Sequence, residues 1–157
     1  MSKLRIISDT RNQDGWKFEG YPCEMVTDML MTGDYSLAGL SHIVSVERKS
    51  KGDLLSCLTD SNRVRLKNEL ERMRGYPYKA LIAECSWEDI NTKNYRSEIH
   101  PNSVYGSLCS WCWSYQIPIF LAGDKVTAER ICFTLFKNFI SNQLKLNQAI
   151  CQHLQEA

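Results

Sequence analysis

The 157-residue sequence carries almost no net charge, because 19 Lys and Arg side chains are balanced by 18 Asp and Glu, leaving +1 at pH 7. No global basic field therefore marks the chain as a binder of nucleic acid. Basic residues exceed acidic ones only locally, between Glu47 and Arg74. This local excess is compatible with contacts to DNA, and equally with a solvated helix of alternating charge.

The sequence also lacks a long apolar run. Its longest apolar stretch, near residues 117–122, is much shorter than the roughly 20 residues that a transmembrane helix needs. No signal peptide is recognisable, and the seven cysteines are an odd number, as expected in a reducing compartment. We therefore expect an intracellular protein without a membrane segment, cytoplasmic in a bacterium or phage-infected cell, or nuclear in a eukaryote.

Support for a zinc site is weak. Cys109 and Cys112 have the spacing of half a zinc site, but no second pair follows, and the three histidines are scattered. Both cysteines fall within an apolar helical pattern. The sequence therefore predicts that they are buried structural thiols.

Short apolar strands alternate with helices along the chain. Strands are expected at residues 4–8, 23–31, 35–37, 43–49, 77–84 and 117–121. Helices are expected at residues 51–58, after a cap at Ser61 or Asn62, after a cap at Asn102 or Ser103, and from about Val126. This order predicts a single α/β domain over residues 1–157, in which helices flank both faces of one mixed sheet. The helix from about residue 126 forms a C-terminal extension.

The most informative segment is Glu47-Arg48-Lys49, which is separated by twelve residues from Asp34 and by three from Asp53. On a strand, Glu47 and Lys49 share one face and Arg48 lies on the other. Carboxylates bind hard divalent cations, and a lysine steadies the attacking water or the developing negative charge. The segment therefore predicts metal-assisted phosphodiester cleavage. The structural alternatives are a simple turn at Asp34 and a salt bridge at Glu47.

Three motifs resemble those of a known family. Residues 9–11 are similar to an opening Asp-x-Arg, residues 33–37 to Gly-Asp-Tyr-x-Leu, and residues 46–54 to Val-Glu-Arg-Lys-Ser-x-x-Asp-Leu. Together they resemble the XPF-type structure-specific endonucleases of the PD-(D/E)xK nuclease superfamily, over roughly residues 3 to 140. One departure is Asn12, where the family commonly has Glu. No helicase domain or tandem helix-hairpin-helix module is recognisable, as in the small stand-alone versions of bacteria and phages.

The resemblance implies a restriction-endonuclease-like core and hydrolysis of DNA with Mg²⁺ or Mn²⁺. It implies selectivity for branched or flapped DNA, in repair, recombination or phage DNA processing. The implied metal ligands are Asp9, Asp34 and Glu47. Further implied catalytic residues are Arg11, as a clamp on the scissile phosphate, together with Arg48, Lys49 and Asp53. Asp53 serves either helix support or direct chemistry, and Glu84 is a further candidate near the site.

The expected partners are DNA and a second copy of the chain. DNA contacts are predicted at Lys51, Arg63, Arg65 and Lys67. A homodimer is predicted through the C-terminal half, where Phe136, Phe139, Ile140 and Leu144 form an apolar strip. Two alternatives remain open: a non-catalytic DNA- or protein-binding member of the family, and a resolvase- or restriction-like nuclease. The retained acids and Lys49 favour the enzyme.

Overall fold

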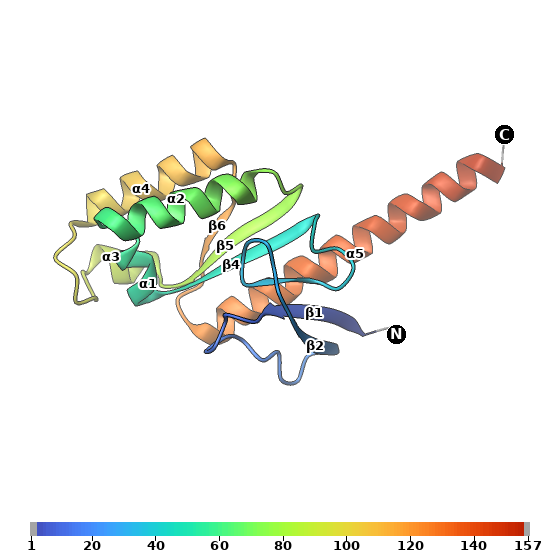
Figure 1. Cartoon of the computed structure of the whole chain (residues 1–157), viewed down its shortest axis with the longest axis horizontal. Helices are drawn as coiled ribbons and strands as arrows, with labels where there is room; N and C mark the ends of the chain where they lie inside the picture. The colour runs from blue at the N-terminus through green and yellow to red at the C-terminus, as the bar shows by residue number, and fades with distance from the viewer. Residues whose placement is uncertain (1–2, 156–157) are drawn as a thin grey trace.

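A computed structural model describes residues 3–155, which form one mixed six-stranded sheet with helices on both faces (Figure 1). The strands are β1 (Leu4–Asp9), β2 (Cys23–Asp28), β3 (Tyr35–Leu37), β4 (Val44–Ser50), β5 (Tyr78–Glu84) and β6 (Ile119–Leu121). The helices are α1 (Lys51–Ser56), α2 (Asp60–Arg74), α3 (Trp87–Asn91), α4 (Pro101–Tyr115) and α5 (Lys125–Gln155). The predicted fold class is confirmed.

The sheet has the strand order β2-β1-β3-β4-β5-β6. Strand β3 pairs antiparallel with both β1 and β4, and the other neighbours pair parallel. The β3–β4 hairpin expected from the sequence therefore lies in the middle of the sheet, where it joins the two parallel parts. The carboxyl ends of β4 and β5 meet at one edge, with Ser50 opposite Glu84.

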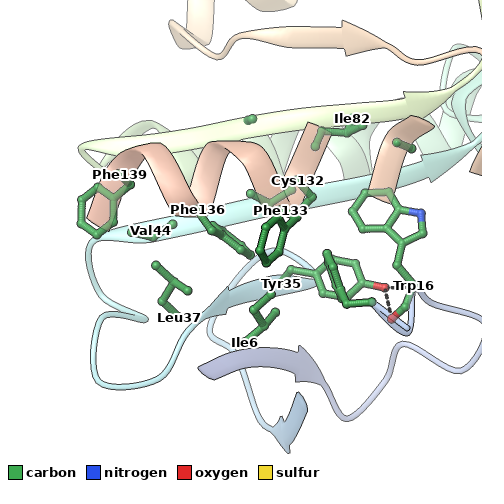
Figure 2. Packing of buried hydrophobic residues seen from close by; sticks show 14 residues of the cluster. Ile6, Trp16, Tyr35, Leu37, Val44, Ile82, Cys132, Phe133, Phe136 and Phe139 are labelled. Atoms are coloured by element: carbon green, nitrogen blue, oxygen red, sulfur yellow. Dashed lines mark hydrogen bonds between the residues drawn. The ribbon is translucent and has the colours of Figure 1, made fainter. Parts of the chain in front are cut away.

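Side-chain alternation along the central strands divides the core into two layers. On β5, Ala80 and Ile82 face one layer, and Leu81 and Ala83 face the other. The first layer contains the amino-terminal half of α5, whose Phe133, Phe136 and Phe139 point toward the sheet (Figure 2). The second layer contains α1 to α4. In each layer the apolar side chains of the helices are buried against the sheet. This burial is the main force that holds the helices on the sheet.

Two helix starts differ from the prediction. Helix α2 is preceded by Thr59, not by Ser61 or Asn62. Thr59 provides no side-chain cap, and its hydroxyl donates to the Ser56 carbonyl. Helix α4 is preceded by His100, whose Nδ1 accepts from the Asn102 amide. Pro101 at the first helical position has the φ angle of a helix and no N–H to satisfy, so the helix starts before Asn102.

Helix α4 corrects the prediction for the cysteines. Its buried residues are Val104, Ser107, Leu108 and Trp111. Cys109 and Cys112 lie outside this stripe and are exposed, so the prediction that they are buried was wrong. Trp111 belongs to the core, and Trp113 is 88% exposed.

The second half of α5 extends away from the sheet (Figure 1). Phe136 and Phe139, which we expected at a dimer seam, are instead buried against the sheet. Beyond them Leu144, Leu146 and Ile150 are exposed. No helix in the part of the chain that the structure describes is long and apolar enough to cross a membrane.

Candidate active site

A polar pocket of about 440 Å³ lies where β4 meets the turn before β3 and helices α1 and α2. Five carboxylates and four basic side chains line it. The acids are Asp9, Asp34, Glu47, Asp53 and Glu69; the bases are Arg11, Lys49, Arg65 and Arg72. The pocket therefore gathers most of the residues that the sequence singled out around the Glu47-Arg48-Lys49 segment.

Asp34 is placed by a glycine turn and by main-chain hydrogen bonds. Gly33 has a φ of +79°, and a Cβ there would collide with the Ser45 hydroxyl, so only glycine fits this turn. The Asp34 amide donates to the Val46 carbonyl over 2.8 Å. Its Oδ2 accepts from the Arg48 amide, also over 2.8 Å. The turn thus fixes the Asp34 carboxylate against β4.

Glu47 and Lys49 share one face of β4, as the alternation predicts. Lys49 Nζ donates to Glu47 Oε1 and lies 3.9 Å from Glu69 Oε2. Glu47 is 2% exposed, and its second oxygen, Oε2, is buried without a hydrogen-bond partner. A buried carboxylate oxygen with no donor is unfavourable unless a ligand completes it.

The buried charges shift one another's proton affinities. Burial raises the pKa of Glu47 well above its ordinary value, and the Asp34 charge adds to the effect. Burial raises the pKa of Asp34 as well. For Lys49, burial acts to lower the pKa, but the carboxylates of Glu47, Glu69 and Asp34 together outweigh it, so that the pKa is raised. Lys49 therefore stays protonated at neutral pH, beside two carboxyls that would gain from a further cation.

The donor set fits a hard divalent cation. Among the side chains that the structure describes, no group of three or more His, Cys, Asp or Glu converges as a ready-made metal cluster. Asp34 and Glu47 nevertheless lie in one pocket, and Glu47 Oε2 has no hydrogen-bond partner. Mg²⁺ is typically held by one or two carboxylates together with water and substrate phosphate, so these two residues suffice.

Asp9 lies at the pocket with both oxygens already engaged. Oδ1 accepts from Arg11 N and Nε at 2.9 and 2.7 Å; Oδ2 accepts from Arg11 Nη2 and the Leu30 amide at 3.1 and 2.7 Å. Burial acts to raise the pKa of Asp9, but these hydrogen bonds outweigh it and the pKa is lowered. Asp9 therefore has no carboxylate oxygen free for the metal-ligand role that was predicted for it. Asp9 instead anchors Arg11, whose side chain is 69% exposed at the rim.

Arg48 contributes its main chain, and not its side chain, to this pocket. The guanidinium lies on the opposite face of the sheet and forms two hydrogen bonds with Glu84, of 2.7 and 3.1 Å. Trp16 Nε1 also donates to Glu84, over 2.8 Å. The direct catalytic role predicted for Arg48 and the approach of Glu84 to the site are therefore not supported by this placement.

Asp53 lies in the first turn of α1, hydrogen-bonded to the N-cap residue Ser50, and also lines the pocket. Its amide donates to the Ser50 hydroxyl over 3.1 Å, and its Oδ2 accepts from the same hydroxyl at 2.7 Å. The helix-support role is thus visible in the hydrogen bonds. A direct role in chemistry stays a prediction.

Helix α2 reaches the pocket with one flank of its apolar stripe. Arg65, Glu69 and Arg72 each precede a buried stripe residue, respectively Leu66, Leu70 and Met73, and all three line the pocket. The predicted DNA contacts Arg63 and Lys67 lie on the other flank and do not line it. Lys51 instead forms an ion pair of 2.8 Å with Asp89. Sequence reasoning missed Glu69 and Arg72, although their spacing from the stripe was available as a signal.

Comparison with known proteins agrees with this geometry. Residues 7–133 match the ERCC4 domain family, and no curated protein matches the chain. XPF from Aeropyrum pernix is similar in structure, with a TM-score of 0.67 and 21% identity over 83% of this chain and 59% of that chain. XPF from Aeropyrum pernix in complex with DNA gives a TM-score of 0.64 and 18% identity over 89% and 66%. The chain spans less than two thirds of the length of either structure.

The matched region includes the pocket from Asp9 to Arg72, the second core layer and most of the first. The resemblance stated from the motifs is therefore confirmed. The fold is that of the XPF structures, and the chain belongs to the ERCC4 domain family.

Proposed function

We propose that this protein is a divalent-metal-dependent endonuclease that hydrolyses DNA phosphodiester bonds in the Asp34–Glu47–Lys49 pocket. The single observation that carries the proposal is the buried, unpartnered Glu47 Oε2 beside Asp34 and a protonated Lys49. Membership of the ERCC4 domain family supports it, as does the likeness to the structure of XPF in complex with DNA. Preference for branched or flapped DNA is part of the proposal.

Asp34 and Glu47 would hold the cation, Mg²⁺ or Mn²⁺. When bound, such an ion activates water and neutralises charge on the phosphate. Lys49 Nζ keeps its proton, because the Glu47 charge raises its pKa. It therefore acts as a fixed positive charge that stabilises the phosphate in the transition state, and not as a base. Arg11, fixed by Asp9 at the rim, orients the phosphate from outside.

The test is a panel of labelled flap, fork, nicked and linear DNAs, incubated with Mg²⁺, Mn²⁺ or chelator. We expect cleavage that needs the cation and favours branched DNA. Asp34→Asn should abolish cleavage while keeping the Arg48 amide bond. The matched control is Asp124→Asn, which makes the same change in the other Gly-Asp turn and retains a cap for Thr127. Full activity in chelator or in Asp34→Asn contradicts the proposal. Binding without cleavage in every condition favours the non-catalytic alternative.

We also propose self-association through the part of α5 that extends beyond the sheet. Leu146, Ile150 and Leu154 are spaced by four residues and are 55%, 48% and 70% exposed. They continue the helix face that carries the buried Cys132 and Phe136. Light scattering at micromolar concentration should give a dimer mass, which Ile150→Glu reduces to that of a monomer. A monomer mass for the unmodified protein, with cleavage intact, contradicts the proposal.

A further inference from the structure

A second groove, of about 860 Å³, lies next to the active-site pocket on the far side of α1. Residues 51, 52, 55 and 56 of α1 and Thr59 form one wall. The loop at residues 93–97, between α3 and α4, forms the other. Ser56 lines both this groove and the active-site pocket, so the two are neighbours across α1.

The groove is positively charged. Among the side chains that the structure describes, its lining contains Lys51, Lys93 and Arg96, and no acidic residue. Lys51 forms an ion pair of 2.8 Å with Asp89. Lys93 and Arg96 are exposed, and neither forms an ion pair with any side chain that the structure describes. Two of the three charges are therefore open to a ligand with negative charge.

The loop that carries these charges is held in place by its own hydrogen bonds. The Asn94 amide donates to the Asp89 carbonyl and its Nδ2 to Asp89 Oδ1, both over 2.8 Å. The Tyr95 hydroxyl donates to the Ile99 carbonyl over 3.1 Å, and the ring packs against the second core layer. Since the loop is fixed before any ligand arrives, ordering it costs little on binding.

We propose that this groove binds the phosphate backbone of a single DNA strand where it leaves the active-site pocket; the inference rests on the proposed nuclease function. A positive groove that follows one backbone is how proteins hold single strands without reading their sequence. A volume in the range of small-ligand clefts, about 300–1,000 Å³, suits a few nucleotides of one strand and not a duplex. The groove thus gives the protein a grip on the unpaired arm of a branched substrate.

The test is a Lys93→Asn/Arg96→Gln variant, which removes both open charges. Asparagine suits residue 93 because its φ is +53°, where most side chains are strained. The matched control is Arg130→Gln/Lys137→Gln, which removes one Arg and one Lys from exposed positions on α5. Circular dichroism and thermal unfolding confirm that both variants are folded.

Binding is measured by fluorescence anisotropy in chelator, with a labelled single strand, a fork with one unpaired arm and a duplex, across a salt series. We expect the groove variant to lose about tenfold in affinity for the single strand and the fork. Its salt slope for the single strand should fall by roughly 0.7 for each lost phosphate contact. Duplex affinity and all values of the control variant should stay unchanged.

Equal losses for the duplex and the single strand overturn the assignment to one strand. If the affinity and the salt slope of the groove variant are unchanged, the proposal that this groove binds DNA is overturned. Because binding is measured without metal, failure of the groove is distinct from failure of the proposed nuclease. The nuclease fails if the unmodified protein binds branched DNA and never cleaves it with Mg²⁺ or Mn²⁺.

Discussion

The two faces of β4 each carry a largely buried ion pair, and the two pairs are built differently. On one face Arg48 and Glu84 form a two-point contact, and Trp16 donates a further hydrogen bond to Glu84. On the other face Lys49 contacts one oxygen of Glu47, and the second oxygen has no partner. The Arg48 pair is complete within the protein, whereas the Lys49 pair is not.

On the proposed function, this difference separates a structural pair from a catalytic one. Buried charges stabilise a fold only when their hydrogen bonds are satisfied, and an unsatisfied carboxylate is costly. The Arg48–Glu84 pair fixes the loop with Trp16 to the end of β5. In the Glu47–Lys49 pair, the Glu47 oxygen without a hydrogen-bond partner belongs to a side chain that lines a polar pocket. Sequence position alone does not distinguish the two, since Arg48 and Lys49 are adjacent.

The largest expected effect comes from replacing the glutamate of each ion pair with glutamine. Glu47→Gln removes the charge that holds the cation, so cleavage should fall by roughly three orders of magnitude or more. Glu84→Gln breaks the structural pair; it should keep the rate and lower the free energy of unfolding by about 3 kcal/mol. Cleavage rates and urea unfolding of both variants give the comparison. A similar loss of rate in both variants would remove the distinction between the faces.

The two basic residues allow the same comparison. Lys49→Ala should reduce kcat on the order of 100-fold while DNA affinity survives, because its charge acts on the transition state. Arg48→Ala keeps the main-chain amide that holds Asp34, so the rate should stay within about tenfold. The free energy of unfolding of Arg48→Ala should be lower than that of the unmodified protein. Single-turnover kinetics and binding in chelator separate the effects. If affinity falls as far as rate in Lys49→Ala, the lysine is only a phosphate anchor.

A smaller effect concerns stability and pH. Burial raises the pKa of Glu47 in the folded protein, so the folded state binds a proton more tightly than the unfolded state. The stabilising contribution of the protonated form is therefore complete at low pH and lost as pH rises through the folded pKa. Between pH 5 and pH 8 the free energy of unfolding of the unmodified protein should therefore fall more than that of Glu47→Gln, which has no carboxyl to titrate at this position. Unfolding curves of both proteins at the two pH values check this.

The smallest effect is expected from Glu69. Its charge contributes to raising the pKa of both Asp34 and Glu47. Glu69→Gln should therefore move the acidic limb of the pH–rate profile to lower pH, because the two carboxyls lose their protons more easily. The matched control is Glu71→Gln, on the exposed side of the same helix. An unchanged profile for Glu69→Gln indicates that this carboxylate does not act on the site.

The sequence predicted the architecture and the grouping of Asp34, Glu47 and Lys49 in one place because both depend on local patterns. Alternation placed Glu47 and Lys49 together, and the Gly33-Asp34 turn brought in the second carboxylate. The engagement of Asp9 was not predictable, because the Leu30 amide that fills its oxygen comes from a distant segment.

The rest depended on tertiary packing. Which flank of the α2 stripe faces the pocket is set by how the helix lies on the sheet, so Glu69 and Arg72 were missed and Arg63 was favoured. The short helix α3 was also missed, although Ser86 and Asp89 form a capping box at its start. The exposure of Cys112 follows from its place on the flank of the α4 stripe.

The central claim is that Glu47 Oε2 and Asp34 bind a divalent cation. The most direct test is an anomalous difference map from crystals of the protein soaked in Mn²⁺. We predict a peak in the pocket, in contact with Glu47 and Asp34, that disappears in Glu47→Gln and persists in Glu84→Gln. A peak bound elsewhere, or an empty pocket at a Mn²⁺ concentration that supports cleavage, would contradict the account.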